Sequence, residues 1–100
     1  MKVCNISFQI EPAVEPIWIA WMQEQFIPSF MATDCFTESR FYQLEVDPTQ
    51  APTYTLQLFA KSPESLELYQ SVHASALILT LHNTWGEQCF HFTSFMQIVN

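Results

Sequence analysis

The sequence predicts one α+β domain in which two helices cover the same face of a four-stranded antiparallel sheet. The chain has 100 residues, which is the usual size of a single domain. Several short stretches alternate apolar and polar residues, as half-buried strands do. Two longer stretches instead repeat apolar residues every three or four positions, as amphipathic helices do. The resulting order of elements is βαββαβ.

The first half of the chain holds a strand, a helix and a second strand. Residues 3–10 alternate apolar and polar side chains, which predicts a strand. Pro12 and Pro16 then suit the first turn of a helix. We expect Pro28 to kink or end this helix, because proline lacks an N–H and its ring clashes with the preceding turn. Residues 35–45 return to strand character.

The second half holds the third strand, the second helix and the last strand. Residues 54–59 alternate and predict a strand. Ser62 followed by Pro63 predicts a helix start, because the hydroxyl caps the first turn and proline fits its first position. This helix extends to about Asn83, and residues 88–99 form the last strand. Right-handed crossovers then give the ferredoxin-like arrangement, with the first and last strands side by side.

The charge and the glycine content exclude several classes of function. Ten Asp and Glu stand against three Lys and Arg, so the chain is acidic, with a net charge of −7, and nucleic-acid binding is not expected. A single glycine, Gly86, leaves no phosphate-binding glycine loop. No apolar run approaches the ~18 residues of a membrane helix. The N-terminus alternates and is unlike a signal peptide, which predicts a cytoplasmic protein.

The cysteines are expected to be free and buried. Cys4, Cys35 and Cys89 form no Cys-x-x-Cys pair. Pairing the centres of the first and last strands, near positions 6 and 93, sets Cys4 opposite position 95. Cys89 then lies ~20 Å away along the strand, which is beyond the reach of a disulfide.

Apart from the second strand, which carries Glu38, Arg40 and Glu45, the sheet face that the helices leave open lacks charged residues, since none occurs in 3–10, 53–60 or 88–99. A solvated antiparallel face normally carries polar and charged side chains. We therefore expect a second copy of the chain to pack against this face and form a homodimer. The alternative is a monomer with an uncharged open face. The expected interface residues are Asn5, Ser7, Gln57, Phe59, His91 and Phe95.

Several short motifs are spread over nearly the whole chain: Trp18-Ile-Ala-Trp-Met22, Ile27-Pro28, Tyr54-x-x-Gln57 and Trp85-Gly86-Glu87. With them the chain resembles a small bacterial family described only as a domain of unknown function, which is similar to the dimeric α/β-barrel superfamily. The resemblance implies two ferredoxin-like sheets packed into one barrel, as in antibiotic-biosynthesis-monooxygenase-like proteins. That superfamily includes cofactor-free monooxygenases, haem-degrading enzymes and isomerases, so the fold alone does not give the function.

The resemblance also implies a small pocket between the helices and the sheet. Its expected lining is Trp18, Trp21, Phe26, Tyr69 and His73, although core packing would explain the four aromatic residues equally well. His73 is the candidate general base, and the alternative is a half-buried histidine bonded to a carbonyl. A ligand there would be apolar or aromatic and not strongly anionic, because the net charge of −7 repels anions.

These observations predict a small cytoplasmic homodimer that binds a small apolar ligand between helices and sheet. The alternative is a cofactor-free monooxygenase or isomerase acting on an aromatic small molecule, with His73 as base. A sensing or partner-binding module without turnover is the third possibility. No cofactor is expected. No metal site is expected either, because His73 and His82 fall on opposite faces of the second helix and no Asp or Glu joins them at a usable spacing.

Overall fold

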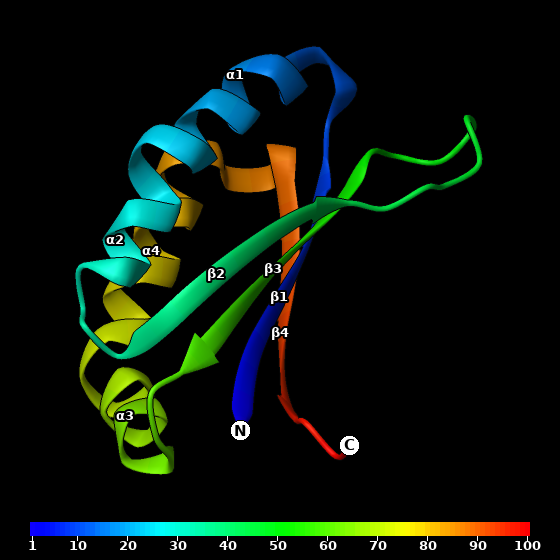
Figure 1. Cartoon of the computed structure of the whole chain (residues 1–100). Coiled ribbons are helices and arrows are strands. Elements are labelled where there is room, and N and C mark those ends of the chain that lie inside the picture. The colour runs from blue at the N-terminus through cyan, green and yellow to red at the C-terminus, as the bar shows by residue number, and fades with distance from the viewer.

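The computed structural model describes residues 1–100 and has the expected order of elements. Its strands are β1 (Lys2–Ile10), β2 (Phe36–Gln43), β3 (Thr53–Ala60) and β4 (Cys89–Gln97). They form one antiparallel sheet in the spatial order β2-β3-β1-β4. The helices lie on one side of this sheet and leave the other side open (Figure 1). The predicted ferredoxin-like α+β fold is therefore confirmed.

Each of the two helical stretches contains a π-helical segment. The first stretch consists of the 3₁₀ turn η1 (Pro12–Val14), α1 (Glu15–Trp21), the π segment η2 (Met22–Phe26) and α2 (Ile27–Met31). The second consists of α3 (Pro63–Leu68), the π segment η3 (Tyr69–His73) and α4 (Ala74–Trp85), followed by the 3₁₀ turn η4 (Gly86–Gln88). No helix is both long enough and apolar enough to cross a membrane.

Pro28 lies inside α2 and does not end the first helical stretch. The π segment η2 directly precedes it, and the N–H of Ile27 bonds to the carbonyl of Met22, five residues back. The wider π turn relaxes the contact between the proline ring and the preceding turn, so the helix continues to Met31.

Both ends of the second helical stretch have recognisable caps. The Ser62 hydroxyl accepts a hydrogen bond from the N–H of Ser65 at 3.1 Å, as the sequence predicts. At the other end Gly86 adopts a φ of 55°, in the left-handed region that favours glycine. Its N–H bonds to the carbonyl of His82, and the chain turns there towards β4.

The first and last strands pair in the predicted register, with Ile6 opposite Thr93 and Cys4 opposite Phe95. Directly paired residues of antiparallel strands point to the same face of the sheet. Ile6 and Cys4 are fully buried beneath the helices. Every second residue of β4 that includes Thr93 therefore lies on the helix side.

The expectation that His91 and Phe95 lie on the open face was therefore wrong. His91 and Phe95 lie on the helix side, whereas Phe90, Phe92 and Met96 lie on the open side. The open side is thus the more apolar side of this strand. However, β4 is an edge strand that the helices cover only in part, because Phe95 is still 49% exposed. Hydrophobicity therefore does not identify its core side.

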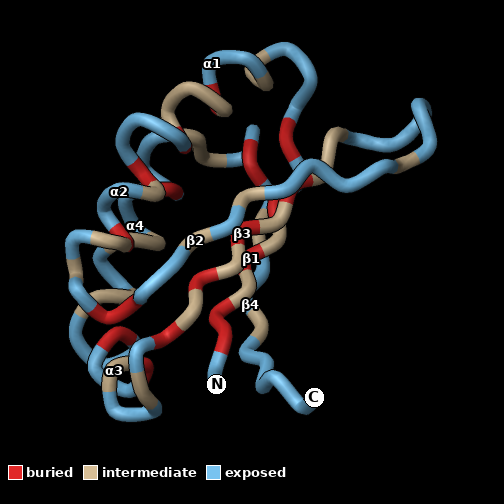
Figure 2. Tube along the Cα trace, in the orientation of Figure 1, coloured by how far each residue is buried: buried red, intermediate tan, exposed pale blue.

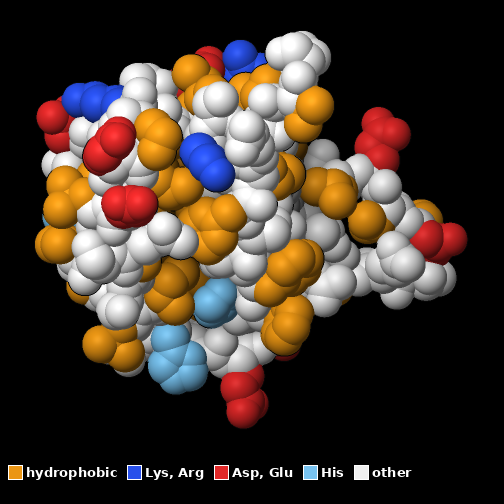
Figure 3. All heavy atoms as spheres, turned by 90° about the horizontal axis from the view of Figure 1, so that it is seen from below, with side chains coloured by type: hydrophobic (Ala, Val, Ile, Leu, Met, Phe, Trp, Pro, Cys, Tyr) orange, Lys and Arg blue, Asp and Glu red, His pale blue; other side chains and the backbone are white.

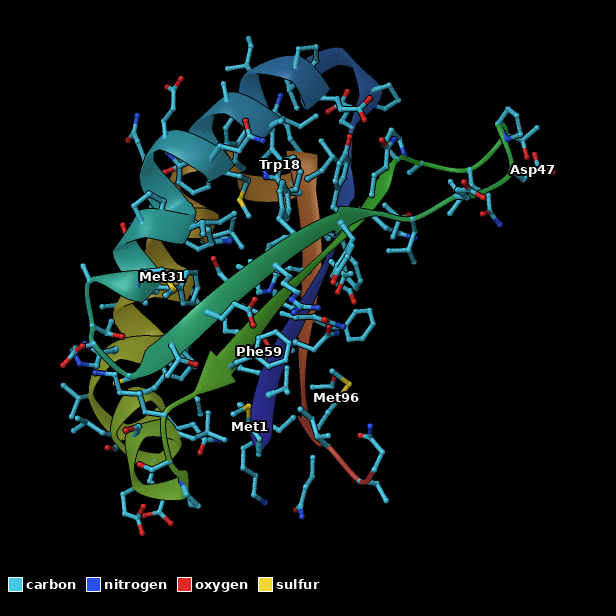
Figure 4. All side chains as sticks on the ribbon, viewed as in Figure 1. Met1, Trp18, Met31, Asp47, Phe59 and Met96 are labelled. Carbon is cyan, nitrogen blue, oxygen red and sulfur yellow. The ribbon has the colours of Figure 1, made fainter.

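The core lies between the helix layer and the sheet, where the buried residues gather (Figure 2). Trp18 points from α1 into this space (Figure 4). Its ring packs on Phe8, Phe41 and Tyr54, with ring centroids 5.3, 5.8 and 5.1 Å away. The Tyr54 hydroxyl also donates a hydrogen bond to Oε2 of Glu15 at 2.5 Å, which links β3 to α1.

Candidate functional site

The aromatic residues expected to line a pocket lie together in the closed core. Trp18, Phe26 and Tyr69 are each at most 2% exposed, and Trp21 stacks on Phe26 with ring centroids 4.7 Å apart. His73 lies at the other end of η3 from Tyr69, four residues further along the chain, and is partly exposed. None of these five residues lines a cavity. Core packing, the alternative interpretation, accounts for the four aromatic residues.

The largest hollow of the structure is a shallow, open groove between α4 and the edge strand β4, with a volume of about 530 Å³. It is lined by Ala74, Ser75, Ile78, Leu79 and His82 of α4 and by His91 of β4. None of these side chains is a carboxylate, an ammonium or a guanidinium. We call this cavity the α4–β4 groove. Its wall is mostly apolar, and it is bordered by two imidazoles, those of His82 on α4 and His91 on β4.

His91 is held in the groove by the pairing of β4 with β1, in which it lies opposite the fully buried Phe8. Its Nδ1 atom is buried and has no hydrogen-bond partner. Burial lowers the pKa of His91 below its ordinary value, and the nearby His82 lowers it further. His91 is therefore a neutral imidazole at neutral pH. Figure 3 shows two histidine side chains next to each other on the surface, with hydrophobic side chains on either side of them.

A second hollow of about 370 Å³ adjoins the groove, because His82 and His91 border both. Its lining also includes Glu87 and the buried Cys89. The two ion pairs of the chain lie elsewhere, so Glu87 is not paired with either histidine. No group of three or more His, Cys, Asp and Glu side chains is arranged to hold a metal ion.

Sequence reasoning missed this groove because it placed His91 on the open face. A signal was nevertheless present in the predicted register. The pairing that sets Ile6 opposite Thr93 also sets Phe8 opposite His91, and Phe8 belongs to the apolar, core-facing side of β1. His91 therefore had to share that side, next to the second helix.

The open face of the sheet carries four of the expected interface residues. Asn5, Ser7, Gln57 and Phe59 lie on it, because they alternate with the buried residues of β1 and β3. They are half-buried, and the Thr55 hydroxyl donates a hydrogen bond to Oδ1 of Asn5 at 2.8 Å. His91 and Phe95, the other two expected residues, lie on the opposite face.

The open face also carries exposed apolar side chains that the sequence did not place there. Phe90 and Phe92 are 65% and 56% exposed there. Val3, in contrast, is almost fully buried although it lies on the same face, since Phe59 and Met96 flank it on the two neighbouring strands. Figure 4 shows Phe59 and Met96 on the side of the sheet away from the helices. No element of the chain covers this apolar area.

The three cysteines are free and buried, as predicted. Burial raises the pKa of the Cys4 thiol, and that of the Cys89 thiol, to about 12. The reactive species of cysteine is the thiolate. Neither side chain therefore acts as a nucleophile near neutral pH.

Several solved structures share this fold at low sequence identity. An ethyl tert-butyl ether d (ethd) family protein from Bacillus halodurans c-125 has a TM-score of 0.72 at 11% identity, with 99% of this chain and 100% of that chain covered. A dimeric ferredoxin-like protein from an uncultured marine organism has a TM-score of 0.70 at 8% identity, with 100% and 96% covered. An antibiotic biosynthesis monooxygenase has a TM-score of 0.66 at 13% identity, with both chains fully covered.

At these identities the structural likeness shows the fold alone. A comparison with curated proteins finds no match. The model of the DUF4286 family, a domain of unknown function, matches residues 1–99. This match spans nearly the whole chain. The chain belongs to the DUF4286 family.

Proposed function

We propose that this chain forms a homodimeric α/β barrel and binds a small apolar molecule between α4 and the sheet. One observation carries the binding role, namely the α4–β4 groove of about 530 Å³ with no charged side chain in its lining. Sites for small molecules typically have volumes of about 300–1,000 Å³ and mostly apolar walls. The apolar part of a ligand would contact Ala74, Ile78 and Leu79.

The open face of the sheet supports the dimer. Two copies that pack by these faces would bury Phe90, Phe92 and Met96 between two sheets. Half-buried amides such as Asn5 and Gln57 can form hydrogen bonds within such an interface. The similar protein from an uncultured marine organism is described as dimeric. The free, buried cysteines support a cytoplasmic location, where thiols stay reduced.

Isothermal titration calorimetry with 1-decanol tests the binding role. We expect saturable binding to the wild type and none to Ile78→Glu, because a carboxylate in the apolar wall disfavours contact with an alkyl chain. Ile17→Glu is the matched control, since Ile17 is 67% exposed on α1 and lines no cavity. A wild type that binds no 1-decanol, or an Ile78→Glu variant that binds it normally, would contradict the proposal.

A cofactor-free monooxygenase or isomerase acting on an aromatic small molecule is the alternative function. The similarity to an antibiotic biosynthesis monooxygenase favours it. His73, its candidate base, lies outside the α4–β4 groove, so this function requires a substrate that reaches η3. It predicts turnover that His73→Gln abolishes without loss of stability. The binding role predicts that the same variant binds 1-decanol normally and that no product forms.

A further inference from the structure

A hollow on the open face of the sheet lies where β2 and β3 are joined. It has a volume of about 190 Å³ and no charged side chain in its lining. Sites for small molecules are typically larger, at about 300–1,000 Å³, so this hollow suits an aliphatic side chain better than a ligand. We call it the Leu44 hollow. Its lining includes residues of three neighbouring strands and of the β2–β3 connection: Ser7, Gln9, Thr53, Phe90, Phe92 and Leu44.

The other end of the same face carries exposed aliphatic side chains. The pairing of β4 with β1 continues beyond Gln97, because the N–H of Ile98 bonds to the carbonyl of Met1 at 2.9 Å. Ile98 therefore follows Met96 on the open side. Ile98 is 40% exposed and the next residue, Val99, is 94% exposed. We call residues Ile98–Val99 the Ile98 segment. Its apolar surface gains free energy when another surface covers it.

The Ile98 segment cannot reach the Leu44 hollow of its own chain. The β2–β3 connection and the C-terminus lie at opposite ends of the sheet (Figure 1). Phe92, which lines the hollow, and Ile98 are six residues apart along one strand, a separation of about 20 Å at the strand rise. The two features can therefore meet only between two molecules.

One symmetry operation brings both pairs of features together. A two-fold axis that lies between two stacked sheets and crosses the strands reverses the strand ends of the second copy. The hollow is level with Ser7 and Gln9 of β1, whereas Ile98 is level with Met1. The midpoint of these levels is close to Asn5. An axis at that level sets the Ile98 segment of each chain over the Leu44 hollow of the other.

The charges on the open face favour the same axis. Glu38 and Arg40 of β2 lie on this face, opposite Phe59 and Gln57 of β3, and their ion pair is half exposed. An axis along the strands would set β4 of one chain over β2 of the other and cover these charges with Phe92, which costs free energy. An axis across the strands sets β4 over β4, so that apolar side chains meet apolar side chains.

We infer that the homodimer has its two-fold axis across the strands and that the Ile98 segment of each chain fills the Leu44 hollow of the other. This inference rests on the proposed homodimer and adds the segments that hold the two chains together. Each dimer contains the contact twice, because a two-fold interface is reciprocal. Neither a hollow nor an Ile98 segment then remains free, so the assembly ends at two chains.

Cross-linking with bismaleimidoethane, a short thiol cross-linker, tests the arrangement. We expect the double variant Leu44→Cys/Ile98→Cys to form a covalent dimer on a denaturing gel. Neither single variant should do so, because the axis places like positions of the two chains far apart at these sites. The native cysteines are buried and free and should not react. Ser94→Cys should link to its own counterpart, since Ser94 pairs with Asn5, close to the axis.

Charge variants test the same contact by sedimentation equilibrium. Ile98→Asp should weaken dimerisation at least tenfold, and so should Leu44→Lys, because each places a charge in an apolar contact that occurs twice per dimer. The double variant Ile98→Asp/Leu44→Lys should dimerise more tightly than either single variant, because opposite charges then face each other. Ile17→Asp is the matched control, since Ile17 is 67% exposed on α1, and it should not change the dissociation constant.

The possible results separate this inference from the proposed homodimer. A monomeric wild type contradicts both. If the wild type is a dimer and Leu44→Cys/Ile98→Cys forms no link between chains, the homodimer stands and the inference is overturned. A dimer in which the charge variants weaken association without compensating each other also overturns the inference, because Leu44 and Ile98 would then not face each other.

Discussion

The two faces of the sheet are made by the same strands but differ in what covers them. On the helix side, Cys4, Ile6 and Phe8 of β1 have no exposed surface. On the open side, Asn5, which alternates with these residues along β1, is half-buried, and Phe92 on the neighbouring strand is 56% exposed. The helix layer thus covers one face and forms a core within the chain, whereas no element of the chain covers the other face. The stability of the chain should depend on the first face and its assembly on the second.

The largest expected effect is the loss of the helix-side core. Trp18→Ala removes a fully buried ring that contacts three other aromatic rings. We expect the free energy of unfolding to fall by about 3–5 kcal/mol, measured by urea denaturation. Ile17→Ala, at the exposed neighbouring position, should change it by less than about 0.5 kcal/mol. Equal losses in the two variants would show that the helix side does not dominate stability.

The next effect concerns assembly through the open face. Phe92→Glu should weaken dimerisation by about 30-fold or more, because central aromatic residues of interfaces contribute about 2 kcal/mol or more. Phe59→Glu should act in the same way. Sedimentation equilibrium measures the dissociation constant, with Ile17→Glu as a control that stays dimeric. If both open-face variants sediment as the wild-type dimer, the interface lies elsewhere.

The thiols of the helix side test how tightly that face is closed. Burial raises the pKa of Cys4 to about 12, so very little of the reactive thiolate is present at pH 8. Cys4 should resist iodoacetamide in the folded protein and react readily in urea. Peptide mass spectrometry identifies the modified position. Rapid modification of Cys4 under native conditions would mean that the helix layer opens often.

The smallest expected effect is a pH dependence of stability through His91. Burial lowers the pKa of His91 in the folded state below its ordinary value of 6.5. As the pH falls below about 6.5, the unfolded chain therefore takes up this proton first. The stabilisation from neutral His91 is fully present above that pH and is lost as the pH falls through the folded-state pKa.

Urea denaturation between about pH 7 and pH 5 checks this dependence. His91→Asn should flatten the curve of stability against pH relative to the wild type. His73→Asn should leave its slope as it is. A wild type and a His91→Asn variant with the same slope would show that His91 is not buried on the helix side.

Features that depend on local sequence could be predicted. The alternation in β1, the Ser62 cap and the register that joins Ile6 to Thr93 follow from periodicity and from the βαββαβ order. The core-facing side of β1 was also evident, because its apolar residues other than Val3 share one parity. Such signals are strong where one face of an element is apolar and the other is polar.

Features that depend on how elements pack against each other could not be predicted. Both sides of β4 carry aromatic residues, such as Phe92 and Phe95, so its pattern does not distinguish a face covered by helices from one covered by another molecule. The α4–β4 groove lies between α4 and the edge strand β4, and no local pattern in the sequence encodes how closely these two elements pack. The continuation of the helix through Pro28 depends on the π segment before it, which has no simple sequence signature.

The π segment η2 also governs how the first helical stretch winds over the sheet. Trp18, Met22, Phe26 and Phe30 follow one another at intervals of four residues, and each is at most 1% exposed. A regular α-helix turns by about 100° per residue, so a row with this spacing would drift by about 40° at each step. The slower winding of η2 corrects the drift midway. In an unbroken α-helix the three steps would add up to about 120°, and Phe30 would turn away from the face on which Trp18 lies.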